Sequence, residues 1–278
     1  MGGGLGLILS LVGSRFGIGG IALVLLGAWM LGMFGGGSSG VVSPAGQSAG
    51  TGAIDDPRAA CAQTPEKRFS CQVLASTEDT WTKLFAATGQ RYQPAQFRFF
   101  TNENESGCGA AQAAMGPFYC PSDNRIYIDT SFYTDLQTKF GAAGDFAQAY
   151  VIAHEVGHHI QTLTGTSDKV RAIQTRSSKA EGNALQVGME LQADCYAGVW
   201  AANSRTSDGQ SAMSPGDAEE GLRAAQAIGD DTLQRSAGQR PVPESFTHGT
   251  SAQRTQWLKT GLESGNPASC DTFGGRLG

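Results

Sequence analysis

The hydrophobic pattern begins with an uninterrupted apolar stretch near the N-terminus. Residues 1–36 are apolar and glycine-rich, and Arg15 is their only charged side chain. The run Phe16–Phe34 contains 19 residues without a charge, which is enough for a helix to cross a hydrocarbon core of about 30 Å. The pattern therefore predicts one N-terminal transmembrane helix within residues 1–36, acting as a membrane anchor.

The residues that flank this run predict how it is used. Arg15 on its N-terminal side favours an orientation with the N-terminus in the cytoplasm. A cleaved signal peptide is the alternative, but no clear Ala-x-Ala site follows the run, so we expect an uncleaved anchor. Residues 37–60 are rich in Gly, Ser and Ala and predict a flexible linker. Residues 61–278 remain as the folded domain.

Within residues 61–278 the apolar positions recur mostly with helical spacing. Short apolar runs predict strands at Gln96–Phe100 and Arg125–Asp129. The longer periodic segments predict helices, at Ser76–Thr88, Asp145–Thr164, Lys179–Asn203, Ser214–Ile228 and Ser251–Ser264. We expect a mainly helical α+β domain with a small sheet.

Start and stop signals set the bounds of these helices. Ser76 or Thr77 is the expected N-cap of the first helix, and Gly89 is its expected stop. Gly165 should end the helix that begins at Asp145. Pro215 suits the first turn of the helix expected from Ser214, because its missing N–H would have no partner there.

Composition and charge narrow the classes of function. The formal net charge is -5, and no run of Lys and Arg occurs anywhere in the chain. A protein that binds nucleic acid needs a basic surface to neutralise phosphates, so we expect no nucleic-acid partner.

The six cysteines predict disulfides rather than a thiolate metal site. They contain no Cys-x-x-Cys pair, and an even number beyond a membrane segment suggests an oxidising compartment. The short spacings favour Cys61–Cys71 and Cys108–Cys120, which leaves Cys195–Cys270. The alternative is that some are buried free thiols, with Cys195 the first candidate.

The strongest chemical signal is the segment His154-Glu155-Val156-Gly157-His158. Residues four apart share one face of a helix, so both imidazoles can reach one metal ion. Neutral imidazole is a common ligand of Zn²⁺. Glu155 would border the metal without closing its coordination, in the position of a general acid/base. Two unrelated surface histidines are the alternative, although three of the four histidines lie within residues 154–159.

A second pair of side chains can complete this site. Glu190 and Asp194 are also four residues apart on a predicted helix. A catalytic zinc of the His₂Glu type needs one carboxylate ligand, for which we predict Glu190. A ligating histidine also needs an acceptor for its second ring nitrogen, for which we predict Asp194. A solvated acidic helix face is the alternative.

Three segments of the chain resemble one bacterial family. HExxH followed by Glu-x-x-x-Asp is similar to the gluzincin pattern. The strings HEVGHHIQ, ELQADCYAGVW and SFTHGTSAQRTQWLKTGLESGNPASCDTF resemble the bacterial putative neutral zinc metallopeptidase family more closely, as does the glycine-rich N-terminus. The resemblance covers about residues 1–36 and 61–278.

The resemblance implies a function and a fold. It implies His154, His158 and Glu190 as ligands of Zn²⁺, with Glu155 as the base. The implied fold is zincin-like, with the HExxH helix under a small sheet and the Glu190 helix beside it. We therefore expect a membrane-anchored zinc metallopeptidase that hydrolyses peptide or protein substrates in the periplasm or at the cell exterior.

Several further residues are candidates for smaller roles. Gluzincin-like sites use a His or Tyr donor for the oxyanion of the tetrahedral intermediate, and His248 is our candidate, with Tyr119 and Tyr127 behind it. His248 as a structural turn residue is the alternative. His159 is interpreted as a packing or surface residue. The strand Arg125–Asp129 could offer an edge to an extended peptide, or be an ordinary strand.

Other functions remain open alternatives at this point. A membrane-anchored scaffold or binding protein could carry a zinc that is not catalytic. A di-iron protein would need a second Glu-x-x-His, which the sequence lacks. A third alternative keeps the hydrolase and changes the substrate to an amide in cell-wall peptide.

Overall fold

The computed structural model describes residues 57–112 and 116–277. The predicted anchor and most of the predicted linker lie outside these residues. The segment Cys61–Gly278 forms one compact unit. No helix among the described residues is long and apolar enough to cross a membrane.

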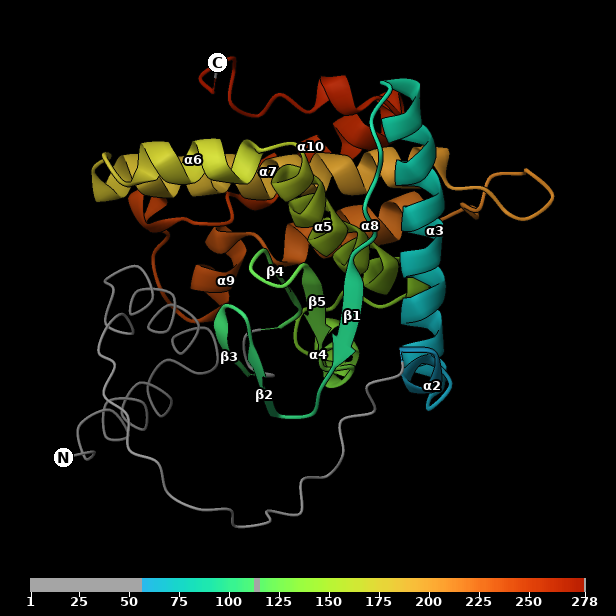
Figure 1. Cartoon of the computed structure of the whole chain (residues 1–278). Helices are drawn as coiled ribbons and strands as arrows, with labels where there is room; N and C mark the ends of the chain where they lie inside the picture. Colours follow the sequence, from blue (N-terminus) through green and yellow to red (C-terminus); the bar gives the residue numbers. More distant parts are fainter. Residues whose placement is uncertain (1–56, 113–115, 278) are drawn as a thin grey trace, which may run out of the picture. The chain divides into compact units, whose positions relative to one another are not determined.

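Helices make up most of the described chain, and the strands are short (Figure 1). The α-helices are α2 Pro57–Cys61, α3 Pro65–Ala87, α4 Ser131–Thr138, α5 Asp145–Leu163, α6 Thr166–Gln174, α7 Lys179–Asn203, α8 Asp217–Ala227, α9 Asp230–Ser236 and α10 Ser251–Ser264, with 3₁₀ turns η2 Pro243–Ser245 and η3 Pro267–Ser269. The strands are β1 Gln96–Phe99, β2 Glu103–Ser106, β3 Gly109–Gln112, β4 Phe118–Cys120 and β5 Arg125–Ile128. The prediction of a mainly helical α+β domain with a small sheet is confirmed.

The sheet is small and mixed. Its strand order is β1-β5-β4, with β5 parallel to β1 and antiparallel to β4. Strands β2 and β3 form a separate antiparallel hairpin. Because β5 is paired on both sides, the expectation that Arg125–Asp129 offers an edge is wrong. The edge that faces helix α5 belongs to β4.

Helix α5 is the centre of the domain. It packs against α7, α8 and α3, and its other side contacts β4 (Figure 1). Apolar side chains from all these elements form one core, in which Ile152 and Val156 of α5 are completely buried. The functional motif on α5 is therefore held between the sheet and the α7 helix.

Helices α7 and α10 have the predicted bounds, and α5 differs by one residue, because the apolar pattern coincides with start or stop signals. Helix α7 begins with a capping box between Ser178 and Glu181, and α10 begins with one between Thr250 and Gln253. Gly165, with φ of 76°, follows the end of α5 as expected.

Two predicted helix starts are wrong. Helix α3 begins at Pro65, where the side chain of Thr64 accepts a hydrogen bond from Lys67 N at 3.2 Å. Thr77 lies inside this helix and its hydroxyl donates to the Leu74 carbonyl, so it caps nothing. Helix α8 begins at Asp217 after Gly216, whose φ of 100° is left-handed, and Pro215 therefore precedes the helix.

All three predicted disulfides are present. They join Cys61 to Cys71, Cys108 to Cys120, and Cys195 to Cys270, and no described cysteine is free. The alternative of a free thiol at Cys195 is therefore wrong. Cys195 and Cys270 are both buried, so this third disulfide fixes the C-terminal segment to the middle of α7.

Candidate metal centre

Two histidines of α5 turn their rings toward one carboxylate of α7. The Nε2 atoms of His154 and His158 lie 3.1 Å and 3.7 Å from the same oxygen, Oε2 of Glu190. The two ring centroids are 4.8 Å apart. The i, i+4 spacing on α5 therefore produces the convergence that the sequence predicts.

Close contact between the two helices makes this convergence possible. A Cβ atom on Gly157 would lie 2.8 Å from the Cα of Ala193, which is closer than side chains tolerate. Helices α5 and α7 thus cross where Gly157 of α5 meets Ala193 of α7, which is three residues after Glu190. One ligand atom from each of His154, His158 and Glu190 lies within 4.8 Å of the others.

This set of donors fits a zinc ion. Two imidazole nitrogens and one carboxylate oxygen are the protein ligands of a His₂Glu zinc site, which keeps one position for water. His154 and Glu190 are buried and His158 is partly buried, so the site is recessed from solvent.

In each of the three ligands, the polar side-chain atom that does not face the metal position makes a hydrogen bond. His154 Nδ1–H donates to Asp194 Oδ1 at 2.8 Å, and the second ring nitrogen of His158 lies 2.9 Å from Gln161 Oε1. Gln186 Nε2 donates to Glu190 Oε1 at 3.0 Å. Such partners fix the ring orientation and leave Nε2 as the ligand atom, and the histidine that Asp194 contacts is His154.

Asp194 belongs to a buried ionic network that the sequence did not indicate. Arg254 of α10 donates from Nε to Asp194 Oδ2 and from Nη2 to Asp194 Oδ1, both at 2.9 Å. Tyr150 donates its hydroxyl to Asp194 Oδ1 at 2.6 Å. Burial alone would raise the pKa of Asp194, but the charges of Arg254 and His154 and their hydrogen bonds together outweigh burial and lower the pKa to about 2. Asp194 is therefore a carboxylate that can only accept from His154.

Glu155 lies beside the ligands without joining them. It is 7% exposed and does not belong to the group of potential ligands. Burial raises the pKa of its carboxyl, while the neighbouring His158 and His154 and the backbone of Tyr119 in β4 act in the opposite direction. A carboxylate with a raised pKa next to a metal site is suited to accept and return a proton.

His248 is held by Asp230 near the third ligand. Its ring Nδ1 lies 3.2 Å from Asp230 Oδ1, and Asp230 Oδ2 accepts the backbone N–H groups of residues 247–249 at 2.7–3.1 Å. The side chain of His248 is 42% exposed. Burial would lower its pKa, but Asp230 and the charge of Glu190 raise it.

The tyrosine candidates and His159 have structural partners. Tyr119 donates to Asn124 Oδ1 at 2.9 Å, and Tyr127 donates to Asp123 Oδ2 at 2.7 Å. His159 is 1% exposed and donates from Nε2 to the Gln93 carbonyl at 2.6 Å, which confirms the interpretation of a packing residue. Each tyrosine hydroxyl thus already donates its single proton, whereas the hydrogen bonds of the His248 ring within the described residues involve Nδ1 alone.

Some of the residues that sequence reasoning missed had a local signal. Tyr150 is four residues before His154, Gln161 is three after His158, and Gln186 is four before Glu190. Helical spacing would have placed all three on the ligand face. Arg254 had no local signal, because it lies 60 positions from Asp194 in the sequence.

Comparison with known proteins gives the class of this site. Residues 1–273 match the family described as "Putative neutral zinc metallopeptidase". The chain therefore belongs to this family, as its motifs indicated.

The relatives are bacterial. The chain is similar to "Uncharacterized protein YpfJ" of Escherichia coli strain K12, with 54% identity over 207 residues that cover 74% of this chain and 71% of the relative. It is also similar to "Uncharacterized protein Rv2575" of Mycobacterium tuberculosis strain H37Rv, with 40% identity over 214 residues that cover 73% and 70%. No solved structure matches the chain.

Proposed function

We propose that this protein is a zinc-dependent peptidase that hydrolyses peptide bonds. The observation that carries the proposal is the convergence of His154 Nε2, His158 Nε2 and Glu190 Oε2, with the carboxyl group of Glu155 beside them but outside the set. Membership of the zinc metallopeptidase family supports the same reading.

Different side chains of the site have different roles in amide hydrolysis. A bound zinc ion would supply Lewis-acid activation of water and of the substrate carbonyl. Glu155 accepts a proton from the attacking water and delivers it to the departing nitrogen. Nδ1–H of His248 donates to Asp230, so Nε2 carries a hydrogen only in the protonated ring, a form that Asp230 and Glu190 favour. In that form His248 donates from Nε2–H to the oxyanion that forms from the carbonyl.

A catalytic zinc is favoured over a structural one. Structural zinc sites are usually closed by four protein ligands and prefer cysteine. All six cysteines of the chain are in disulfides, and the described residues bring only three donors to this site. A scaffold or binding protein with a non-catalytic zinc remains the rival function, and a water ligand on the bound metal would argue against it.

The edge of the sheet suggests how an extended substrate binds. Strand β4 is at the end of the sheet, and the backbone of Tyr119 contacts Glu155. Extended peptides bind to such edges by strand addition, which would bring a scissile amide next to Glu155. The substrate is therefore proposed to be an extended peptide or protein segment, with cell-wall peptide as the rival.

The test is the variant Glu155→Gln in the full chain, assayed on a broad peptide library. Glutamine keeps the shape of the side chain but cannot accept the proton. Zinc content should stay at the wild-type level while hydrolysis falls by about 10²-fold or more. Loss of zinc would make Glu155 a ligand, and full activity would mean that the hydrolysis has another base.

The membrane anchor is a proposal from the sequence alone. The charge-free run Phe16–Phe34 supports it, together with the three disulfides expected of a domain outside the cytoplasm. The full chain should fractionate with membranes, and a chain lacking residues 1–36 should be soluble. A mature soluble protein that begins after the apolar run would show a cleaved signal peptide instead.

A further inference from the structure

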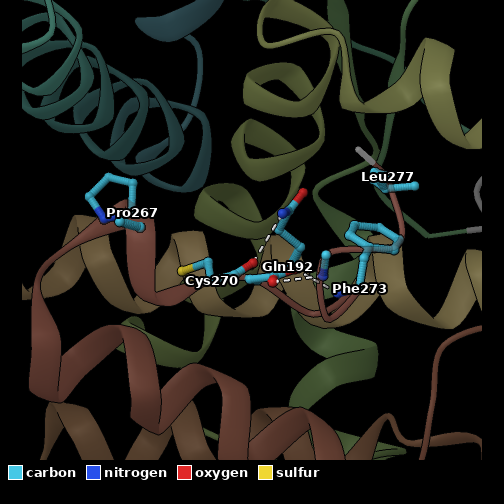
Figure 2. Close-up of a pocket in the computed structure, with 8 residues that line it drawn as sticks. Gln192, Pro267, Cys270, Phe273 and Leu277 are labelled. Atoms are coloured by element: carbon cyan, nitrogen blue, oxygen red, sulfur yellow. Dashed lines mark hydrogen bonds between the residues drawn. The ribbon is translucent and has the colours of Figure 1, made fainter.

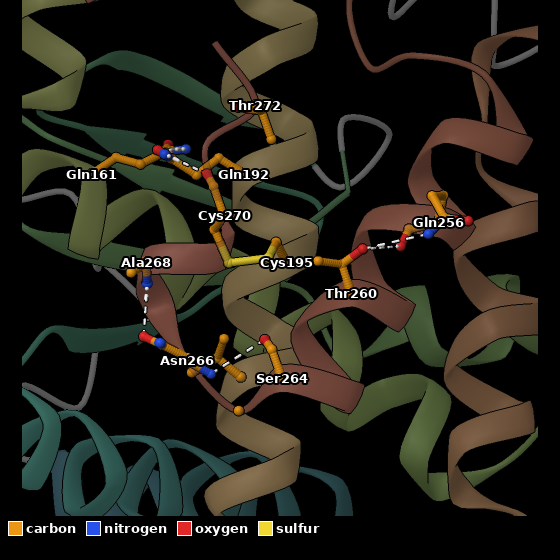
Figure 3. Close-up of a disulfide and its surroundings, with 12 residues drawn as sticks. Gln161, Gln192, Cys195, Gln256, Thr260, Ser264, Asn266, Ala268, Cys270 and Thr272 are labelled. Atoms are coloured by element: carbon orange, nitrogen blue, oxygen red, sulfur yellow. Dashed lines mark hydrogen bonds between the residues drawn. A yellow bond between two sulfur atoms is a disulfide. The ribbon is translucent and has the colours of Figure 1, made fainter. Parts of the chain in front are cut away.

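The zinc ligand His158 is connected to a disulfide through two buried glutamines. Its ring Nδ1 lies 2.9 Å from Gln161 Oε1. Gln161 Nε2 donates to Gln192 Oε1 at 3.2 Å, and Gln192 Nε2 donates to the Cys270 carbonyl at 3.0 Å (Figure 3). We call Gln161 and Gln192 the glutamine relay.

The relay has a direction, and the backbone sets it. The Cys270 carbonyl can only accept, so Gln192 must present its NH₂ group to it and its oxygen to Gln161. Gln161 must then present its own NH₂ group to Gln192 and its oxygen to His158. The carbonyl of Met189 fixes the same orientation independently, since it accepts from Gln161 Nε2 at 2.7 Å.

This direction decides which nitrogen of His158 carries the proton. Facing the oxygen of Gln161, Nδ1 must be the donor, and Nε2 is left with a lone pair directed at Glu190 Oε2 and the proposed metal. Reversing the amides would set oxygen against oxygen at Met189 and at Cys270. Gln161 is completely buried and Gln192 is 7% exposed, so water cannot relieve such a conflict cheaply.

The far end of the relay is fixed covalently. Cys270 is bound to Cys195 of α7, the helix that also carries Gln192 and Glu190 (Figure 3). A surface pocket lined by Gln192, Pro267, Cys270 and Phe273 lies at this end (Figure 2). The carbonyl that orients the relay is thus held in place by the disulfide.

We propose that Gln161 and Gln192 are positioning residues that fix the zinc-binding tautomer of His158 from the Cys195–Cys270 disulfide. The proposal rests on the zinc site of the proposed function but not on its peptidase activity. It also accounts for an asymmetry of the site: His154 is held by the carboxylate Asp194, whereas His158 is held by a neutral amide. A neutral relay adds no further buried negative charge to Glu190 and Asp194.

The test uses the full chain with ¹⁵N-labelled histidine, whose four rings are few enough to assign. The variants are Gln161→Met, which removes the acceptor, and Gln161→Glu, which keeps the acceptor but cannot donate to Met189. Gln174→Met is the control, because Gln174 is the last residue of α6 and donates to the Gly182 carbonyl in the first turn of α7, away from the site. Zinc affinity, melting temperature and the exchange of the His158 Nδ1–H proton are measured for each.

The expected result separates metal binding from stability. Gln161→Met should weaken zinc binding by about 10–100-fold and speed exchange of the His158 proton, while the His154 proton remains protected. Gln161→Glu should melt at a lower temperature yet keep the His158 proton and most of the zinc affinity. Gln174→Met should bind zinc as the wild type does. If Gln161→Met does not fold, Gln192→Met decides, because it leaves Gln161 held by Met189 alone. Faster exchange of the His158 proton in that variant supports the relay, and unchanged exchange overturns it.

Four outcomes overturn different conclusions. Zinc affinity and proton exchange unchanged in Gln161→Met overturn the relay alone, as does affinity that falls in step with melting temperature in both Gln161 variants. Zinc binding by the wild type without peptide hydrolysis overturns the peptidase and leaves the relay. A wild-type chain that binds no zinc overturns both.

Discussion

At the scale of single residues, each proposed zinc ligand depends on a second side chain that the metal would not touch. Asp194 holds His154, Gln161 holds His158, and Gln186 holds the second oxygen of Glu190. In the same way, Asp230 holds the Nδ1 atom of His248. Because Asp194 and Gln161 are themselves fixed by further hydrogen bonds, the ring nitrogens of the two histidines are oriented before a metal arrives, which lowers the cost of ordering them.

Asp230 gives a prediction about pH. Burial alone would raise its pKa, but the ring of His248 and the backbone N–H groups lower it below the ordinary value of about 3.9. A carboxylate with a lowered pKa in the folded state stabilises the fold above the unfolded pKa, and this stabilisation is lost as the pH falls through the folded pKa.

The variant Asp230→Asn should therefore be less stable than the wild type near pH 6, and the difference should shrink below about pH 4. Urea unfolding at a series of pH values measures it. Asp168→Asn, on the exposed surface of α6, is the control for loss of one carboxylate. A difference that stays constant from pH 6 to pH 3 would mean that the charge of Asp230 contributes nothing.

At the scale of elements, the site depends on how closely α5 and α7 cross. Gly157 allows the contact, since an added Cβ would meet the backbone of Ala193 at 2.8 Å from Cα and 3.0 Å from the carbonyl oxygen. Backbone atoms cannot rotate aside as a side chain can. The helices would have to separate, and the distance from the two histidines to Glu190 would change with them.

Gly157→Ala should therefore destabilise the fold by about 1–3 kcal/mol, the usual cost of overpacking, and also weaken zinc binding. Gly182→Ala is the matched control, because it lies on α7 with no atom within 4 Å of an added Cβ. The control should be neutral or stabilise by up to about 1 kcal/mol through helix propensity. Calorimetry measures the stability of both variants, and zinc titration measures their affinity. Equal stability and equal zinc affinity of the two variants would refute the close crossing.

Elements with a long, regular pattern were predictable from the sequence, and short ones were not. Helices α7 and α10 have the predicted bounds, and α5 differs by one residue, because periodic apolar positions and caps or stop signals coincide. Strand β4 has three residues, too few for a visible alternation, and it was missed although its backbone borders Glu155. The start of α3 was misplaced because Ser76 and Thr77 resemble caps, while the hydroxyl of Thr77 donates to Leu74 inside the helix.

The candidate site likewise has a part that local sequence patterns predict and a part that depends on tertiary contacts. Pairs at helical spacing, such as His154 with His158 and Glu190 with Asp194, follow from one segment of sequence. That the two pairs meet depends on helix packing, and the sequence supported it through known motifs only. Arg254 and the steps of the glutamine relay beyond Gln161 depend on contacts between α5, α7, α10 and the C-terminal segment, for which no local pattern exists.

At the scale of the whole folded domain, distant segments are tied together by one long-range disulfide. Cys195 and Cys270 are 75 positions apart, and the chain between them includes His248 and Arg254. Closing a loop of this length removes more conformational entropy from the unfolded chain than closing a short one. The contrast within this protein is Cys61–Cys71, whose cysteines are 10 positions apart, at the junction of α2 and α3.

Replacing both cysteines of a bridge by alanine should show this difference. On the chain-entropy relation, loss of Cys195–Cys270 costs about 4.5 kcal/mol of stability and loss of Cys61–Cys71 about 2.7 kcal/mol. Unfolding in denaturant under oxidising conditions measures both. The Cys195–Cys270 variant should also bind zinc less tightly, since the carbonyl that orients Gln192 loses its anchor, while the Cys61–Cys71 variant keeps its affinity. Equal losses of stability, or zinc affinity insensitive to both, would show that the long-range bridge neither dominates the stability of the domain nor supports the metal centre.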